Sequence, residues 1–312
     1  MVMQRDTGWY RSIFSPNTPE ERAHNFELYW QFSQDHAGLL LEAEQDLTRK
    51  RETLRGFQAD PIRSRAPLPD PEAFYRNYVQ CQDAPGAIDR KTLLLTSIYK
   101  VARHEWVGIT GAWNATEAFS DTQHVVTKIC RYHLAEEFGH IRLFEEMFHT
   151  FHLTQVQWVP LQPFMQRVYQ VFPRLPGAMM DPLAFVSELI GLMFYRAVDA
   201  VLDEVYADEP EACHRVRALL HEITVDELAH IGQRRNFLSP RGVRAARWLV
   251  RPMFSAFFKG IPEHPYLFDV QAMTRDALAF DYNTMAPALL ERSWVPTYCR
   301  PLETALCATG TP

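Results

Sequence analysis

The sequence predicts a nearly all-α protein of 312 residues. Three observations lead to this fold class. Apolar residues recur at the 3.6-residue spacing of helices over long segments, while alternating β-branched runs are rare. Short polar turns separate two pairs of these segments, which predicts two helical hairpins. A longer connection joins the hairpins, and this connectivity is known among four-helix bundles.

Start and stop signals place the predicted helices. The first covers residues 18–55 and begins at Thr18-Pro19-Glu20-Glu21, a pattern typical of a helix start. Residues 60–71 contain four prolines and are predicted to form a loop. The first predicted hairpin, the crossover helix and the second predicted hairpin follow in order: 89–118 with 122–152, then 161–172, then 182–206 with 211–238.

We expect a single domain over residues 1–312. Its core is predicted at 89–238, with an N-terminal helical extension over 1–88 and a C-terminal helical extension over 239–312. The C-terminal extension opens with the basic amphipathic stretch RGVRAARWLVRPMFSAFFKG, which we expect to cover the bundle with its arginines in water. Docking to a carrier protein or to a membrane surface is the alternative for this stretch.

Composition excludes several classes of protein. The formal net charge of −6 argues against a general nucleic-acid binder. Five scattered cysteines without a C-x-x-C motif indicate reduced thiols in a cytoplasmic protein. The N-terminus, MVMQRDTGWYRS, contains no apolar run of signal-peptide length, and no segment approaches the 18 uncharged apolar residues expected of a transmembrane span.

Pairs of ionisable residues interrupt the apolar stripes of the predicted core helices. An E-x-x-H pair places a carboxylate and an imidazole about one helical turn apart on one face, which suits a metal ion inside a bundle. The chain contains five such pairs, but Glu137/His140 and Glu227/His230 are the ones that lie mid-helix on an inward stripe. The other three are predicted to be solvated: Glu21/His24, Glu146/His149 and Glu211/His214.

The register of each hairpin supplies one further glutamate. Glu137 lies 16 residues after position 121, and Glu105 lies 16 residues before it. Glu227 lies 18 or 19 residues after the turn near 208, and an equal step back falls next to Glu188. All four glutamates then lie on the order of 25 Å from their turns. We therefore expect six residues to converge at one depth: Glu105, Glu137, His140, Glu188, Glu227 and His230.

Six ionisable groups in one core would be costly to bury without partners, and bound divalent cations would remove that cost. Four carboxylates and two imidazoles favour iron or manganese over a structural zinc. A buried ion-pair network without metal is the alternative. Arg234 is expected either to anchor a substrate carboxylate or to pair with Glu136. Small and apolar neighbours are predicted to line a substrate pocket: Gly108, Ala112, Phe144, Gly191, Tyr195 and Ile223.

The segments Glu136-Glu137-Phe138-Gly139-His140 and Asp226-Glu227-Leu228-Ala229-His230, with Glu105 and Glu188, resemble the ferritin-like non-haem di-iron carboxylate superfamily. The resemblance covers residues 89–238 and implies a ferritin-like four-helix bundle with two iron ions, as Fe/Fe or Mn/Fe. It implies that Glu137 and Glu227 bridge the ions or bind beside the bridge, and that Glu105 and Glu188 are terminal ligands. His140 and His230 would each bind one ion. It further implies that Glu136 and Asp226 hydrogen-bond the ligand histidines.

Departures from the superfamily's patterns indicate which of its subclasses this chain resembles most. Phe144 stands where the small subunits of ribonucleotide reductase usually carry a tyrosine, and the chain is longer than a ferritin. The layout is more similar to arylamine N-oxygenases, and more distantly to acyl-carrier-protein desaturases. The N-oxygenases have an additional histidine where this chain has Ile223, whereas His133 holds the equivalent place on the other motif helix. His133 is interpreted either as an extra ligand or as a core histidine.

These features predict an oxidoreductase, specifically a non-haem di-iron monooxygenase or oxidase with O2 as co-substrate. The expected reaction is C–H hydroxylation or N-oxygenation of a small organic substrate. The expected partners are an electron donor such as a ferredoxin or a reductase, and a second copy in a homodimer. Two alternatives remain: a desaturase or oxidase for carrier-tethered acyl chains, and a di-metal-binding or ligand-binding protein without turnover.

Overall fold

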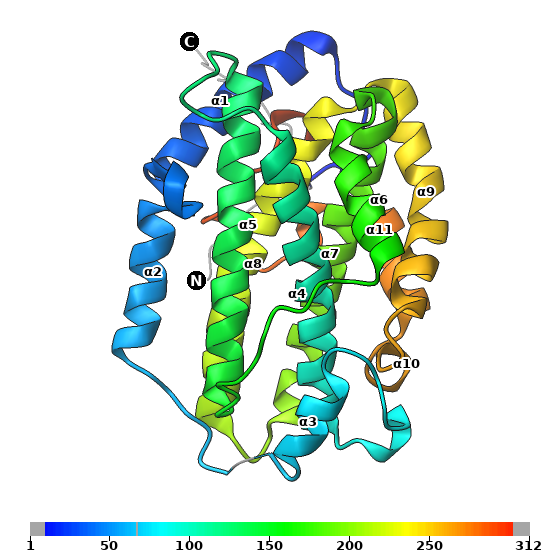
Figure 1. The fold of residues 1–312 in the computed structure, drawn as a ribbon. Coiled ribbons are helices and arrows are strands. Elements are labelled where there is room, and N and C mark those ends of the chain that lie inside the picture. Colours follow the sequence, from blue (N-terminus) through cyan, green and yellow to red (C-terminus); the bar gives the residue numbers. More distant parts are fainter. Residues whose placement is uncertain (1–9, 67, 302–312) are drawn as a thin grey trace, which may run out of the picture.

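The computed structural model describes residues 10–66 and 68–301 as an almost entirely helical fold (Figure 1). Within this described part, strand pairing is limited to a short antiparallel ladder of β1 (Leu40–Leu41) with β2 (Asp46–Leu47) and one isolated bridge. The predicted all-α class is therefore confirmed. No helix in the described ranges combines the length and the apolar character needed to cross a lipid bilayer.

The four longest helices lie side by side and carry most of the core. They are α4 (Arg90–Ala115), α5 (Val125–Thr150), α7 (Gly177–Val205) and α8 (Pro210–Phe237). Short turns make α4 antiparallel to α5 and α7 antiparallel to α8, and α5 also packs directly against α8. This arrangement brings the middle segments of all four helices to one level in the interior (Figure 1).

Local signals explain where these helices begin. The side chain of Asp89 accepts hydrogen bonds from the backbone N–H groups of Lys91 and Thr92, which caps α4. Pro210 occupies the first turn of α8, where its missing N–H has no helical partner to lose. Helix α7 begins at Gly177 instead of the predicted residue 182, because Pro182 is accommodated inside the helix. The crossover contains α6 (Pro163–Val171) and the 3₁₀ turn η3 (Phe172–Arg174), which lie along α4.

The prediction of one long N-terminal helix over residues 18–55 is wrong. Helix α1 (Pro19–Ala37) starts with the predicted Thr18 capping box but ends at Gly38, whose φ of 79° is a region that favours glycine. A Cβ at Gly38 would lie 2.3 Å from Oγ1 of Thr48. The chain turns through β1, the 3₁₀ turn η1 (Glu42–Glu44) and β2 before α2 (Thr48–Ala59) begins.

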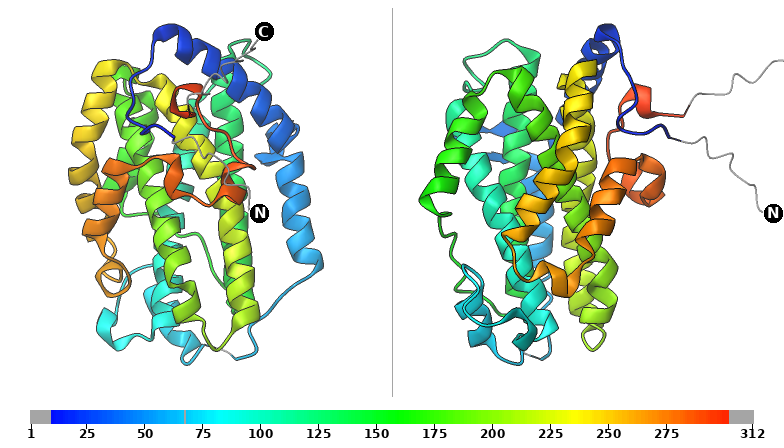
Figure 2. Two further views of the ribbon diagram at one scale, coloured as in Figure 1. Left: turned by 180° about the vertical axis from the view of Figure 1, so that it is seen from behind. Right: turned by 90° about the vertical axis from the view of Figure 1, so that its right-hand side faces the viewer.

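Helices from both extensions cover the long helices. Helices α1 and α2 pack against α5, and α1 also contacts α8, whereas α3 (Pro71–Asn77) packs against α4. The basic amphipathic stretch forms α9 (Pro240–Lys259), and its apolar side is buried. This helix packs along α7, and Figure 2 shows its course from two sides. The rest of the described chain forms short elements: η2 (Pro85–Ala87), α10 (His264–Leu267), α11 (Val270–Ala279), η4 (Tyr282–Thr284), α12 (Pro287–Leu290) and η5 (Thr297–Cys299).

Candidate metal centre

The structure brings the six predicted ligand residues together in the interior. Glu105 projects from α4, Glu188 from α7, and one E-x-x-H pair projects from each of α5 and α8. The side chains of Glu105 and Glu188 are 13% and 12% exposed. Those of Glu137, His140, Glu227 and His230 are nearly or fully buried. The open side of the cluster therefore faces α4 and α7.

The side chains form two groups that share Glu137. One group contains Glu105, Glu137 and His140, and the other contains His133, Glu137, Glu188 and His230. Within each group the ligand atoms lie within 4.8 Å of one another, a spacing that could hold a metal ion. Oε2 of Glu137 lies 3.4 Å from Nδ1 of His140, and its Oε1 lies 3.0 Å from Nδ1 of His230. One carboxylate thus faces both groups.

The predicted ligand Glu227 and the possible extra ligand His133 also lie in the cluster. Glu227 belongs to neither compact group, but its Oε1 lies 3.5 Å from Nδ1 of His140, on the side of Glu105. The ring of His133 stacks on His230 with centroids 3.8 Å apart. Nε2 of His133 lies 3.3 Å from Glu137 and 3.4 Å from Glu188. His133 therefore lies among the candidate ligands.

The imidazoles of the two E-x-x-H motifs are held by acids from the opposite helix. Nε2 of His140 lies 3.2 Å from Oδ2 of Asp226, and Nε2 of His230 lies 2.8 Å from Oε2 of Glu136. Nδ1 of each ring faces the cluster, is buried and has no hydrogen-bond partner among residues 10–66 and 68–301. A carboxylate that fixes one ring nitrogen while the other points inward is the arrangement found around metal-binding histidines.

Burial and the neighbouring charges raise the proton affinity of four side chains in the cluster. Burial, aided by the negative charge of Glu137, raises the pKa of Glu105 to about 8 and that of Glu227 well above its usual range. Burial disfavours charged imidazoles, yet the surrounding carboxylates raise the pKa values of His140 and His230 well above normal. Burial also opposes ionisation of Glu137, but the facing imidazoles hold its pKa well below normal. Bound divalent cations would displace these protons.

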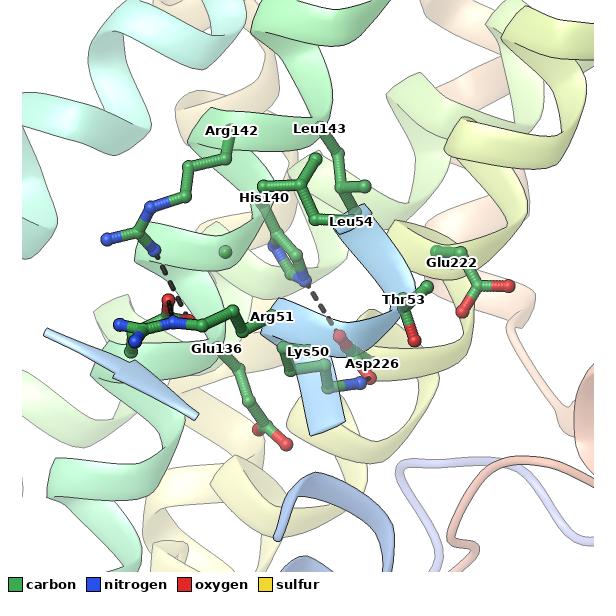
Figure 3. A pocket seen from close by; sticks show the side chains of 12 residues that line it. Lys50, Arg51, Thr53, Leu54, Glu136, His140, Arg142, Leu143, Glu222 and Asp226 are labelled. Atoms are coloured by element: carbon green, nitrogen blue, oxygen red, sulfur yellow. Dashed lines mark hydrogen bonds and ion pairs between the residues drawn. The ribbon is translucent and has the colours of Figure 1, made fainter. Parts of the chain in front are cut away.

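An outer layer of contacts, absent from the sequence predictions, fixes Asp226. Nζ of Lys50 lies 2.5 Å from Oδ1 of Asp226, and Nε2 of His36 lies 3.3 Å from the same oxygen. Figure 3 shows Lys50, Asp226, His140 and Glu136 around a small cavity under α2. Its volume of about 20 Å³ is room for about one water molecule. Helices α1 and α2 thus contact the candidate metal centre through Asp226.

Further contacts orient Glu105 and Glu188. The hydroxyl of Tyr195 donates a hydrogen bond to Oε2 of Glu105 at 2.8 Å. Nε of Arg234 donates to Oε1 of Glu188 at 3.2 Å, so the pairing with Glu136, one of the two alternatives for Arg234, is not what the structure shows. The spacing of Tyr195 and Arg234, one heptad beyond Glu188 and Glu227, is the sequence signal that placed both near the cluster.

The predicted substrate-pocket residues are not all free to line a cavity. A Cβ at Gly108 would lie 3.3 Å from the ring of Tyr169 in α6, so this aromatic side chain occupies the space expected for substrate. A Cβ at Gly191 would lie 3.3 Å from Oε2 of Glu227. Phe144 and Ile223 are fully buried core residues, whereas Ala112 is a partly buried residue packed on the core.

Comparison with known proteins identifies no relative: no family model, curated protein or solved structure matches the chain.

Proposed function

We propose that the protein is a ferritin-like di-iron oxygenase or oxidase that acts on a small organic substrate. The observation that carries this proposal is the orientation of the two imidazoles. Each has its Nε2 held by an acid, while its Nδ1 is buried against shared carboxylates and has no hydrogen-bond partner in the described part of the chain. Two helical hairpins joined by a crossover, with E-x-x-H on two helices and a glutamate on each of the other two, form the di-metal pattern of such bundles.

The donor set suggests how two ions would be shared. Glu105, His140 and Glu227 would serve one ion, and Glu188, His230 and His133 would serve the other. Glu137 would lie between them. Carboxylates and imidazoles in this ratio favour iron, either as Fe/Fe or in combination with manganese. Such a pair of ions, when bound, supplies reduction of O2 coupled to oxidation of a C–H or N–H bond.

The chain's own residues position and shield this chemistry. Asp226 and Glu136 fix the two imidazoles, and Tyr195 and Arg234 orient the terminal glutamates. Burial of most side chains of the cluster limits their contact with water, which strengthens the electrostatic interactions inside. Transfer of one oxygen atom to the substrate needs two further electrons from an external donor, such as a ferredoxin or a reductase, and the second oxygen atom leaves as water. The free cysteines fit a reducing compartment such as the cytoplasm.

Anaerobic loading with ferrous iron, followed by mixing with O2, tests the proposal. The wild-type protein should bind about two ferrous ions per chain, consume O2 and oxidise the iron. Glu137→Ala should abolish all three, because it removes the carboxylate that faces both groups. Glu211→Ala is the matched control, since it removes an E-x-x-H glutamate from the exposed start of α8. Stoichiometric iron binding without any O2 consumption would refute the oxygenase assignment while leaving a metal-binding protein.

A further inference from the structure

The outward side of α9 carries a row of unneutralised positive charge. The helix contains four arginines and one lysine but no acidic residue, although the whole chain has a formal charge of −6. Arg241, Arg244, Trp248 and Arg251 repeat at intervals of three or four residues and are all exposed. None of these arginines forms an ion pair within the described part of the chain. The indole of Trp248, 74% exposed, lies in the middle of the row.

Exposed apolar side chains gather on the neighbouring crossover. Phe164, Val168 and Val171 share one face of α6, and Met179 follows in the first turn of α7. With Trp248 they make up five of the seven large hydrophobic residues exposed in the described ranges, so these residues are concentrated there and not scattered.

The two helices flank the same stretch of α4. The ring of His104 contacts Tyr169 of α6, with centroids 5.9 Å apart, and Phe257 of α9, with centroids 5.1 Å apart. Figure 1 shows α6 and α9 on the same flank of the molecule. The arginine row and the apolar stripe therefore lie on two surface helices on one flank of the molecule. We call them together the α6/α9 face, consisting of Phe164, Val168, Val171, Met179, Arg241, Arg244, Trp248 and Arg251.

The charge and apolar character of the α6/α9 face indicate which kind of partner can bind there. In a two-fold interface with a second copy, the same patch would meet itself and bring two arginine rows together. A partner that carries dense negative charge with an apolar layer beneath it would match both the arginine row and the apolar side chains of the face. An anionic lipid surface has this composition, and arginine with tryptophan and phenylalanine is the combination that binds at such interfaces.

We propose that the α6/α9 face binds the surface of an anionic lipid membrane. The arginines lie at the level of the lipid phosphates, and Trp248 and Phe164 enter the headgroup layer. The buried side of α9, formed by Val243, Ala246, Val250, Phe254 and Phe258, stays packed on the protein, so the fold itself does not change. This binding does not depend on the candidate metal centre.

Co-sedimentation with lipid vesicles tests the proposal on the full chain. The protein should sediment with vesicles containing phosphatidylglycerol, bind pure phosphatidylcholine vesicles much more weakly, and dissociate as salt is raised. The triple variant Arg241→Ser/Arg244→Ser/Arg251→Ser should weaken binding by about a hundredfold. Trp248→Ser should also weaken binding to the vesicles, and the size of this loss should be the same at every salt concentration.

A charge-matched variant supplies the control. Arg55→Ser/Arg65→Ser/Arg90→Ser removes three exposed arginines outside the face and should bind vesicles almost as well as the wild type. The proposal is overturned if the wild type does not sediment with anionic vesicles, or if both triple variants lose binding equally. It is also overturned if the face binds an acidic carrier protein, or a second copy, but no vesicles. Metal binding should be equal in all variants.

Discussion

Glu136 and Asp226 should each govern one metal position. Asp226 holds His140, which belongs to the group with Glu105, whereas Glu136 holds His230, which belongs to the group with Glu188. Replacing either acid by its amide keeps the shape of the side chain and removes its charge. We therefore expect Asp226→Asn to weaken mainly one of two metal-binding events, and Glu136→Gln to weaken mainly the other.

The size of each effect follows from the contacts. A hydrogen bond to a charged group contributes about 1.5–3 kcal/mol and a neutral one about 0.5–1.5 kcal/mol, so each amide should cost roughly 1–1.5 kcal/mol of metal binding. That is about a tenfold loss of affinity, the lower end of the range for partners of metal-ligating histidines. Asp226→Asn has a second consequence, because it leaves Lys50 without its carboxylate at 2.5 Å. Breaking a buried ion pair costs about 3–5 kcal/mol of stability.

Calorimetric titration with manganese and chemical denaturation measure both effects. Asp226→Asn should lower the free energy of unfolding by several kcal/mol more than Glu136→Gln. Glu222→Gln is the control, because Glu222 lines the same cavity but pairs with Arg292. The reasoning is refuted if either amide variant weakens both binding events equally, or if the two variants unfold at the same denaturant concentration.

Three further predictions concern the same cluster and its surroundings. Gly191→Ala should reduce metal affinity by about tenfold without unfolding the protein, because its Cβ would lie 3.3 Å from Oε2 of Glu227; metal titration checks this. Gly56→Ala, in α2 with nothing within 4 Å of the added carbon, should raise the free energy of unfolding by about 0.5–1 kcal/mol and leave metal affinity unchanged. Glu105 and His140 bind protons more tightly in the folded state, so the metal-free protein should lose stability as pH rises from 6.5 to about 8. Carboxylates with lowered pKa values stay ionised throughout that interval, and metal affinity, measured by titration at each pH, should rise across it.

The placement of the cluster follows from local sequence patterns. Glu137 and Glu227 lie on inward stripes, and the short turns at the hairpin ends set the depth of Glu105 and Glu188 by counting residues. Helical phase and register are properties of neighbouring residues, so they can be evaluated without knowing the tertiary structure. The same reasoning predicted the position of His133 on the stripe but left its role open.

Contacts between distant segments could not be predicted in this way. Lys50 and His36 reach Asp226 only because the chain turns at Gly38 and folds α2 back on α5. The helical pattern of residues 18–55 continues through that turn. The single glycine was therefore not enough to predict that the first helix ends there. Tyr169 fills the space over Gly108 because the crossover packs on α4, and no periodicity in α4 indicates what covers it.

Anomalous scattering from crystals grown with manganese would test the shared metal centre most directly. We predict two peaks on either side of Glu137, one against Glu105 and His140 and the other against Glu188 and His230. No peak among these residues, in crystals whose side chains keep the arrangement described above, would contradict a metal centre at this site.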